Sequence, residues 1–213
     1  MTRYADIEAA AAPAGLIVMG AEHPTDGIGT RMLLGAGSSF WAIVSTSPEY
    51  LDGSPDPVDR FSTRVVSALA AQFEAEAAYP FGGPPYTPFI AWAKSSGRAW
   101  SSPTGMLVHD VAGLMISYRG ALHFSERLEI PAPPAASPCT TCSEQPCTTA
   151  CPIGALSATQ AYDVPACHGF LGTDAGEDCM SLGCKARRAC PVSRGFGRDP
   201  AQSAHHMRAF HPS

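Results

Sequence analysis

The sequence predicts an α+β protein in which an N-terminal α/β sandwich-like domain precedes a cysteine-rich module. The N-terminal part contains no cysteine and combines short apolar runs with one long amphipathic helix pattern. All eight cysteines lie between Cys139 and Cys190. Between the two parts stands PAPPAASP, which is half proline and therefore typical of an extended connector. We expect a domain at 1–130, a linker at 131–138, a cysteine module at 139–198, and a C-terminal helix and tail at 199–213.

The N-terminal part predicts two helices and a buried strand. A short helix is expected at 5–12, and the apolar run AGLIVM predicts a strand at 14–19. The run FWAIVS at 40–45 fits a strand or a helix, because periodicity cannot separate the two in so short a segment. The clearest helix begins at Asp56-Pro57, since aspartate caps helices and proline suits the first helical position. Its apolar stripe, which we interpret as core packing, consists of Val58, Phe61, Val65, Leu69 and Phe73.

Two further elements flank the cysteines. The runs 107–111 and 114–118 surround Ala112-Gly113, which predicts two strands joined by a tight turn. A last helix is expected from Asp199-Pro200 to Phe210, with Gln202 in the position that completes a capping box.

Charge and hydropathy exclude several classes. The net charge of -5 argues against a nucleic-acid binder, because phosphate neutralisation needs a basic excess. The longest apolar stretch, 9–21, is shorter than the roughly 18 residues of a membrane span, so no membrane partner is expected. Asp6 and Glu8 stand where a signal peptide is basic, so the mature chain is expected to start at Met1. No Walker loop, G-x-G-x-x-G or Ser-His-Asp pattern is present.

Eight cysteines fit either four disulfides or metal ligation. Disulfide scaffolds are usually small and lack a separate core, whereas a long cysteine-free part comes first in this chain. Metal ligation is therefore favoured. Because reducing conditions keep thiolates free, we expect an intracellular, cytoplasmic protein.

The first four cysteines are closely spaced, as Cys139-x2-Cys142-x4-Cys147-x3-Cys151-Pro152. The bacterial ferredoxin run is C-x2-C-x2-C-x3-C-P, so this chain departs from it only by two extra residues in the middle spacing. Structural zinc sites usually use separated C-x2-C pairs. The spacing therefore favours iron–sulfur chemistry.

The remaining cysteines supply ligands for a second cluster, and the module is expected to be bacterial ferredoxin-like with two [4Fe-4S] clusters. In two-cluster ferredoxins the last cysteine of each run binds the other cluster. That rule predicts Cys139, Cys142, Cys147 and Cys190 on cluster 1, and Cys151, Cys167, Cys179 and Cys184 on cluster 2. One cluster with four spare thiols, or a zinc site, is the alternative.

Several motifs between Gly97 and Arg194 resemble those of the epoxyqueuosine reductase family. The motifs are LVHDVAGLMISYRGAL, a proline-rich link, CPIGAL, ACHGFL, and a GC…CP ending at 183–191. The resemblance implies a cobalamin-reductase-type domain before a two-cluster module. It also implies an oxidoreductase that exchanges electrons with a donor or acceptor protein.

Two departures from the family pattern matter. Cys184-x5-Cys190 lacks the family's middle cysteine, for which Cys179 is the substitute upstream. The stretch YPFGGPPYTPFIAWA at 79–93 has no Asp or Glu where the family carries an acidic catalytic residue. The sequence therefore predicts redox chemistry without predicting epoxyqueuosine reduction, and it names no catalytic residue.

The same stretch is rich in aromatic side chains. Tyr79, Phe81, Tyr86, Phe89, Trp92 and Trp100 are six of the chain's eighteen aromatics. The loop predicts either a pocket for a flat ligand or an aromatic plug of the core. The resemblance would put a corrinoid there, with candidate contacts at Phe81, Gly82, Gly83, Tyr86 and Trp92.

Other polar groups carry less information. The run Lys185-Ala186-Arg187-Arg188 predicts an exposed charged face, or a surface that offsets cluster charge or docks an acidic partner. His109 and His168 are interpreted as structural. The functional hypotheses are a reductase that passes electrons through two clusters to a cofactor or substrate, a plain electron carrier, and a structural metal-binding protein.

Overall fold

The computed structural model describes residues 2–25 and 27–212, and it forms two compact units. The first contains the chain up to Ala99 together with Ser117–Pro134, and the second contains Trp100–Ile116 together with the chain from Ala135 onward. The predicted α+β class is confirmed, with antiparallel sheets. The division differs from the predicted domain at 1–130, because residues 100–116 group with the cysteines.

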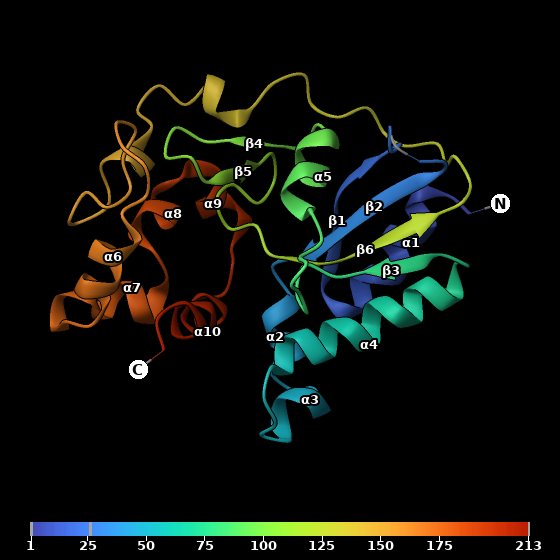
Figure 1. Cartoon of the computed structure of the whole chain (residues 1–213), viewed down its shortest axis with the longest axis horizontal. Helices are drawn as coiled ribbons and strands as arrows, with labels where there is room; N and C mark the ends of the chain where they lie inside the picture. The colour runs from blue at the N-terminus through green and yellow to red at the C-terminus, as the bar shows by residue number, and fades with distance from the viewer. Residues whose placement is uncertain (1, 26, 213) are drawn as a thin grey trace. The chain divides into compact units, whose positions relative to one another are not determined.

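The first unit is built on a four-stranded antiparallel sheet in the order β1-β2-β6-β3 (Figure 1). The strands are β1 (Leu16–Glu22), β2 (Thr30–Ala36), β3 (Glu76–Ala78) and β6 (Tyr118–Phe124). In register, Leu16 pairs with Ala36, and Thr30 pairs with Phe124. Because β6 lies between β2 and β3, distant parts of the chain form neighbouring strands.

Helices cover one face of this sheet. They are α1 (Tyr4–Ala11), α2 (Phe40–Val44) and α4 (Pro57–Gln72), with α4 running alongside the sheet (Figure 1). The short helix α3 (Pro48–Leu51) packs against α4. The core between them is apolar because alternate strand residues point to the same face. It includes Ile7 of α1, Met32 and Leu34 of β2, Phe61 of α4 and Leu122 of β6, all buried.

The other face of the sheet carries a polar row near helix α5 (Phe89–Ser95). Arg31 pairs with Glu22 across β1 and β2, and both side chains are about nine-tenths buried. The Arg31 guanidinium lies 3.9 Å from the centre of the Trp92 ring, in cation–π geometry. Trp92 also meets the His123 ring edge-on at 5.1 Å.

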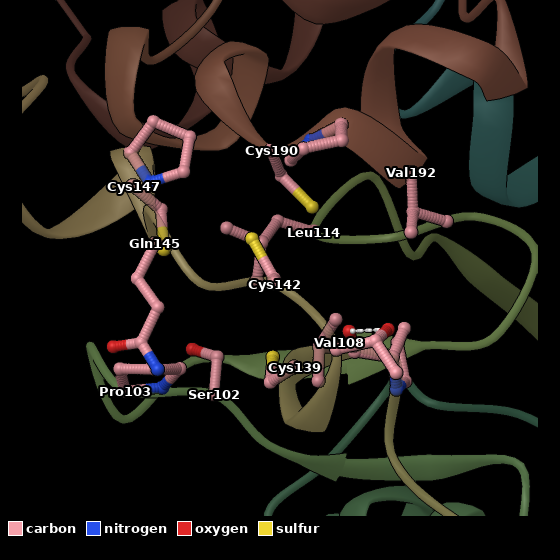
Figure 2. Close-up of a pocket in the computed structure, with 14 residues that line it drawn as sticks. Ser102, Pro103, Val108, Leu114, Cys139, Cys142, Gln145, Cys147, Cys190 and Val192 are labelled. Carbon is pink, nitrogen blue, oxygen red and sulfur yellow. Dashed lines mark hydrogen bonds between the residues drawn. The ribbon is translucent and has the colours of Figure 1, made fainter.

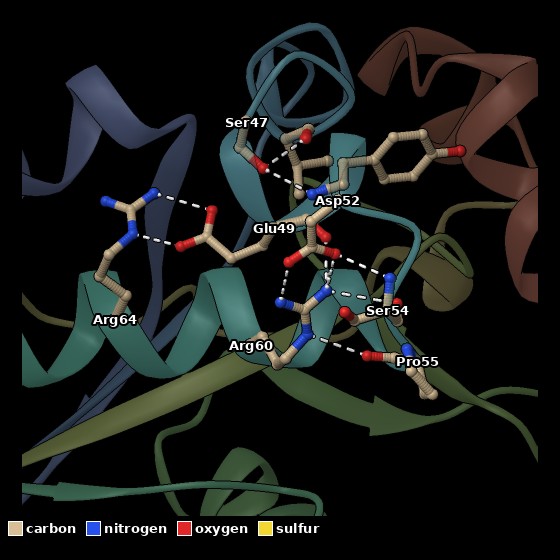
Figure 3. Close-up of polar contacts among 9 residues, drawn as sticks. Ser47, Glu49, Asp52, Ser54, Pro55, Arg60 and Arg64 are labelled. Atoms are coloured by element: carbon tan, nitrogen blue, oxygen red, sulfur yellow. Dashed lines mark hydrogen bonds and ion pairs between the residues drawn. The ribbon is translucent and has the colours of Figure 1, made fainter.

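Two arginines of α4 hold the turn that precedes this helix (Figure 3). Arg60 bonds both carboxylate oxygens of Asp52 at 2.7 Å and donates to the Pro55 carbonyl at 2.9 Å. Arg64 pairs with Glu49 of α3. Asp56 stands immediately before α4, as predicted, but its side chain makes no capping hydrogen bond. Its φ of +53° differs from the extended backbone usual at this position, and the predicted cap is therefore wrong.

Within its described residues, the second unit contains a short hairpin and five α-helices, besides single turns of 3-10 helix. Its elements are β4 (Ala99–Ser101), β5 (Leu107–His109), α6 (Val164–Leu171), α7 (Glu177–Leu182), α8 (Lys185–Ala189), α9 (Pro191–Phe196) and α10 (Pro200–Phe210). Within the described ranges, no helix combines the length and apolar surface that crossing a bilayer requires.

Four other local predictions have clear outcomes. The segment at 40–45 is the helix α2 rather than a strand. The predicted strand pair is confirmed only in part: β5 forms at 107–109 and His109 makes an antiparallel bridge to Gly113, but β5 pairs with β4 and 114–117 is irregular. Asp199 caps α10 through the Ala201 amide at 2.8 Å. The capping box is wrong, since both amide atoms of Gln202 are buried without a hydrogen-bond partner in the described structure.

Candidate metal centre

The first group of cysteines surrounds one cavity in the second unit. Cys139, Cys142, Cys147 and Cys190 line a cavity of about 230 Å³, and Figure 2 shows their sulfur atoms on different sides of it. Cys147 and Cys190 are buried, whereas Cys139 and Cys142 are half-buried. Most of the remaining lining is apolar, including Val108, Leu114 and Val192.

The other four cysteines surround a second cavity of the same unit. Cys151, Cys167, Cys179 and Cys184 line this cavity of about 260 Å³. Cys179 is buried and the others are half-buried. Ile153, Leu156 and Phe170 contribute apolar walls, and Tyr162 and Arg187 add polar groups. The two cavities thus contain the same cysteines as the two predicted ligand sets.

All eight cysteines are free thiols, and their environments keep several of them protonated. Burial raises the pKa of Cys147, and the nearby Cys190 and Cys139 raise it further. Burial likewise raises the pKa of Cys167, with a contribution from Cys151. Since metals bind thiolates, loading either cavity would release protons.

A preformed site for a single metal ion would need the cysteine sulfurs to be arranged differently from four atoms around a cavity. Around zinc, each sulfur lies about 2.3 Å from the metal, so the four sulfurs crowd together. Among residues 2–25 and 27–212, no group of three or more His, Cys, Asp or Glu side chains is placed to hold a metal ion.

Two similar turns present cysteines to the first cavity. Pro138–Thr140 and Pro146–Thr148 are both Pro-Cys-Thr in sequence and both form one turn of 3-10 helix. Proline begins each turn because its fixed φ suits that position. The fourth cysteine, Cys190, lies at the junction of α8 and α9, immediately before Pro191.

The β4–β5 hairpin forms a wall of the first cavity, which the sequence did not reveal. Ser102 and Pro103 come from its turn, Val108 from β5, and Leu114 from the segment that follows (Figure 2). Val108 and Leu114 share an apolar cluster with Cys147 and Cys190. These contacts link residues far apart in sequence, so local periodicity carries no signal for them.

Three polar groups act on the cysteine thiols. Burial raises the pKa of Cys139, Cys167 and Cys179, and hydrogen bonding from Ser137, Tyr162 and the Lys185 backbone, respectively, opposes that rise. Ser137 and Tyr162 were not singled out from the sequence. The sequence could have indicated that Tyr162 lies near Cys167, because Tyr162 immediately precedes Asp163, the cap of the helix that carries Cys167.

The basic run at 185–188 is largely engaged within the second unit. Arg188 pairs with Asp178 and donates to the Gly183 carbonyl at 2.8 Å, which braces the turn between α7 and α8. Lys185 lies 3.6 Å from the same carboxylate. Arg187 instead lines the second cavity.

The histidines have structural surroundings. His109 is fully buried, and its Nδ1 accepts hydrogen bonds from the Val111 and Ala112 amides at 3.1 and 3.3 Å. The Nδ1 atoms of His168 and His211 are 2.7 Å apart. These contacts fix a turn and the end of α10.

The candidate corrinoid contacts belong to the first unit. Phe81 packs against Tyr79 at 5.3 Å, and Trp92 is covered by Arg31. Tyr86 is 68% exposed. The aromatic loop therefore joins the packing of the first unit through Phe81 and Trp92, while Tyr86 faces solvent.

Comparison with protein-family models and with curated proteins finds no match.

Proposed function

We propose that this chain is an iron–sulfur redox protein that holds two [4Fe-4S] clusters in its second unit. The observation that carries the proposal is the sorting of eight free cysteines into two cavities with four each. Four thiolates per cluster is the ligand number that a [4Fe-4S] cluster requires. A ferredoxin-like module is the part of the predicted fold that this arrangement supports.

The size of the cavities supports a compact inorganic group. Pockets for drug-sized organic ligands occupy about 300–1,000 Å³, whereas these cavities are about 230 and 260 Å³. A four-iron cube also holds its thiolates at separate corners, farther apart than one ion does. In each cavity, four cysteines contribute to the lining.

The surroundings support electron transfer in particular. Such a cluster supplies one-electron chemistry, and its potential depends on burial and on hydrogen bonds to sulfur. Both cavities have largely apolar walls, and Cys147, Cys179 and Cys190 are buried.

Two versions of this proposal differ in where the electrons go. In the first, the protein is a reductase of the epoxyqueuosine reductase type, and the first unit holds a substrate or a corrinoid. In the second, it is a cytoplasmic electron carrier for a protein partner. The packing of Phe81 and Trp92 against neighbouring side chains favours the carrier.

Anaerobic reconstitution with iron and sulfide tests the proposal. We expect about eight iron and eight sulfide per chain, and an EPR signal from reduced clusters after dithionite addition. Zinc in place of iron, or clusters that dithionite does not reduce, would overturn it. Addition of cobalamin to the reconstituted protein tests the reductase variant: a spectral shift supports it, and absence of binding leaves the carrier.

A further inference from the structure

The second cysteine cavity differs from the first in the apolar side chains that reach solvent beside it. Ile153 and Phe210 both line the second cavity, and they are 43% and 37% exposed. Among the described residues, no large apolar side chain that lines the first cavity is exposed to this degree. Exposed apolar side chains that gather at one opening, instead of being scattered, are typical of interaction sites.

The local chain holds both side chains next to proposed ligands. Ile153 is an inner residue of a turn that the Gly154 amide closes on the Cys151 carbonyl at 3.1 Å. The helix α10 ends at Phe210, whose ring stacks on His168 with the ring centroids 4.5 Å apart. His168 directly follows Cys167 in the sequence. A molecule that contacts Ile153 and Phe210 therefore comes close to the group proposed for the second cavity.

The charged residues that line this cavity are all cationic. They are Lys185 and Arg187 of α8, and no aspartate or glutamate lines either cysteine cavity. Asp178 pairs with Arg188 and lies 3.6 Å from Lys185, whereas Arg187 makes no ion pair with a described residue. Arg187 therefore places a positive charge beside exposed apolar side chains, although the whole chain has a net charge of -5.

We propose that a redox protein with an acidic surface docks on Ile153, Phe210 and Arg187 and exchanges one electron with the cluster of the second cavity. The inference rests on the proposed function and deepens it by naming the kind of partner. Because the cluster would fill the cavity, the docking surface outside it fits a macromolecule and not a small ligand. Carboxylates around an apolar area of the partner complement the positive charge, which speeds encounter and orients the two proteins.

Stopped-flow reduction by an acidic flavodoxin tests the inference on reconstituted, oxidised protein. The anionic flavin hydroquinone becomes the neutral semiquinone as the cluster gains one electron, and no bond breaks. We expect the second-order rate constant to fall about tenfold between about 10 mM and about 500 mM salt, because salt screens the attraction. The net charge of -5 predicts the opposite trend for two acidic proteins that meet without a preferred surface. A rate constant that rises with salt or stays constant overturns the inference.

Two variants test the charged and the apolar part of the surface. Arg187→Gln should lower the rate constant about threefold to tenfold at low salt and leave it unchanged at high salt. Its control is Arg194→Gln, at an exposed arginine of α9 that lines neither cysteine cavity, which should change the rate constant at neither salt level. Ile153→Ala should lower the rate constant about fivefold at both salt levels. Its control is Val111→Ala, at a residue that is 45% exposed and lines neither cavity, and it should have no effect.

The outcomes separate this inference from the function on which it rests. Wild-type protein that binds no iron overturns both. If Arg187→Gln slows reduction equally at low and high salt, the arginine acts on the cluster and not on docking, and the inference alone is overturned. A reconstituted dimer that Ile153→Ala dissociates assigns the surface to a second copy of the chain and also overturns it. If Arg187→Gln loads poorly, the salt dependence of the wild type and the effect of Ile153→Ala decide the question.

Discussion

The backbone N–H of Leu114 donates a 2.8 Å hydrogen bond to the Ser193 hydroxyl, and both residues are buried. Ser193 lies on α9, which begins directly after Cys190. Leu114 belongs to the same apolar cluster as Cys190 and Cys147. This bond therefore holds the end of the 100–116 segment against the helix that positions a proposed cluster ligand.

Substitution of Gly113 tests how closely this contact is fitted. Gly113 has φ +58°, and an added Cβ would lie 2.4 Å from the Ser193 backbone nitrogen. We expect Gly113→Ala to lower the free energy of unfolding by about 2–4 kcal/mol, from backbone strain plus overpacking. Iron should also be lost faster to a chelator.

Gly105→Ala is the matched control for this substitution. Gly105 has φ +78° but no atom within 4 Å of an added Cβ, so only the backbone strain of about 1 kcal/mol applies. Thermal unfolding of both variants measures the difference. Equal destabilisation would contradict a close fit between Gly113 and α9.

Burial separates the consequences of breaking two Glu–Arg pairs in the first unit. The pair of Glu22 and Arg31 is about nine-tenths buried, whereas the Arg64 side chain that meets Glu49 is 56% exposed. Glu22→Ala leaves a buried charge without its partner and should cost about 3–5 kcal/mol. Glu49→Ala should cost under about 1 kcal/mol. Urea denaturation compares them, and similar costs would refute the ranking by burial.

The Glu49–Arg64 pair also predicts a pH dependence. Hydrogen bonding to Arg64 lowers the pKa of Glu49 from 4.5 to about 2 (Figure 3). Because the folded pKa is the lower one, the pair stabilises the fold above pH 4.5, and this contribution is lost as pH falls through about 2.

Arg64→Gln reveals that dependence. At neutral pH the variant should be less stable by under about 1 kcal/mol, and the difference from the wild type should shrink below pH 4.5. Arg127→Gln makes the same charge change at an exposed arginine without an ion-pair partner in the described structure. A difference between Arg64→Gln and the wild type that is constant from neutral pH to pH 2 would contradict the linkage.

Local patterns explain what the sequence could predict. The helix α4 was recognisable because Val58, Phe61 and Leu69 are spaced for one helical face, and all three are buried. The grouping of cysteines followed from a rule about ligand sharing, which needs no knowledge of the fold. Predictions of specific side-chain hydrogen bonds were weaker, as the Gln202 amide without a hydrogen-bond partner in the described structure illustrates.

Distant contacts explain what the sequence could not predict. Leu114 was assigned to a strand because of its apolar neighbours, yet it is buried by packing with Cys190 and by the bond to Ser193. The insertion of β6 between β2 and β3 likewise joins segments that no local pattern relates. The wall of the first cavity comes from such contacts and was therefore absent from the predicted site.

Serine substitutions test the assignment of ligands to two clusters. If Cys139 and Cys190 bind one cluster, either Cys→Ser change alone should reduce iron from about eight to about four per chain. The Cys139→Ser, Cys190→Ser double variant should lose no more iron than either single variant, because both changes remove the same cluster.

The decisive comparison combines Cys190→Ser with a change in the other cavity. Cys179 lines the second cavity, so Cys179→Ser together with Cys190→Ser should leave almost no iron. If this double variant instead keeps about four iron, Cys190 and Cys179 serve one cluster, and Cys190 does not cross to the ligands of the first run. Because Cys190 is far from Cys139 in sequence yet lines the same cavity, iron counts from these two double variants distinguish ligation by spatial neighbours from ligation by sequence neighbours.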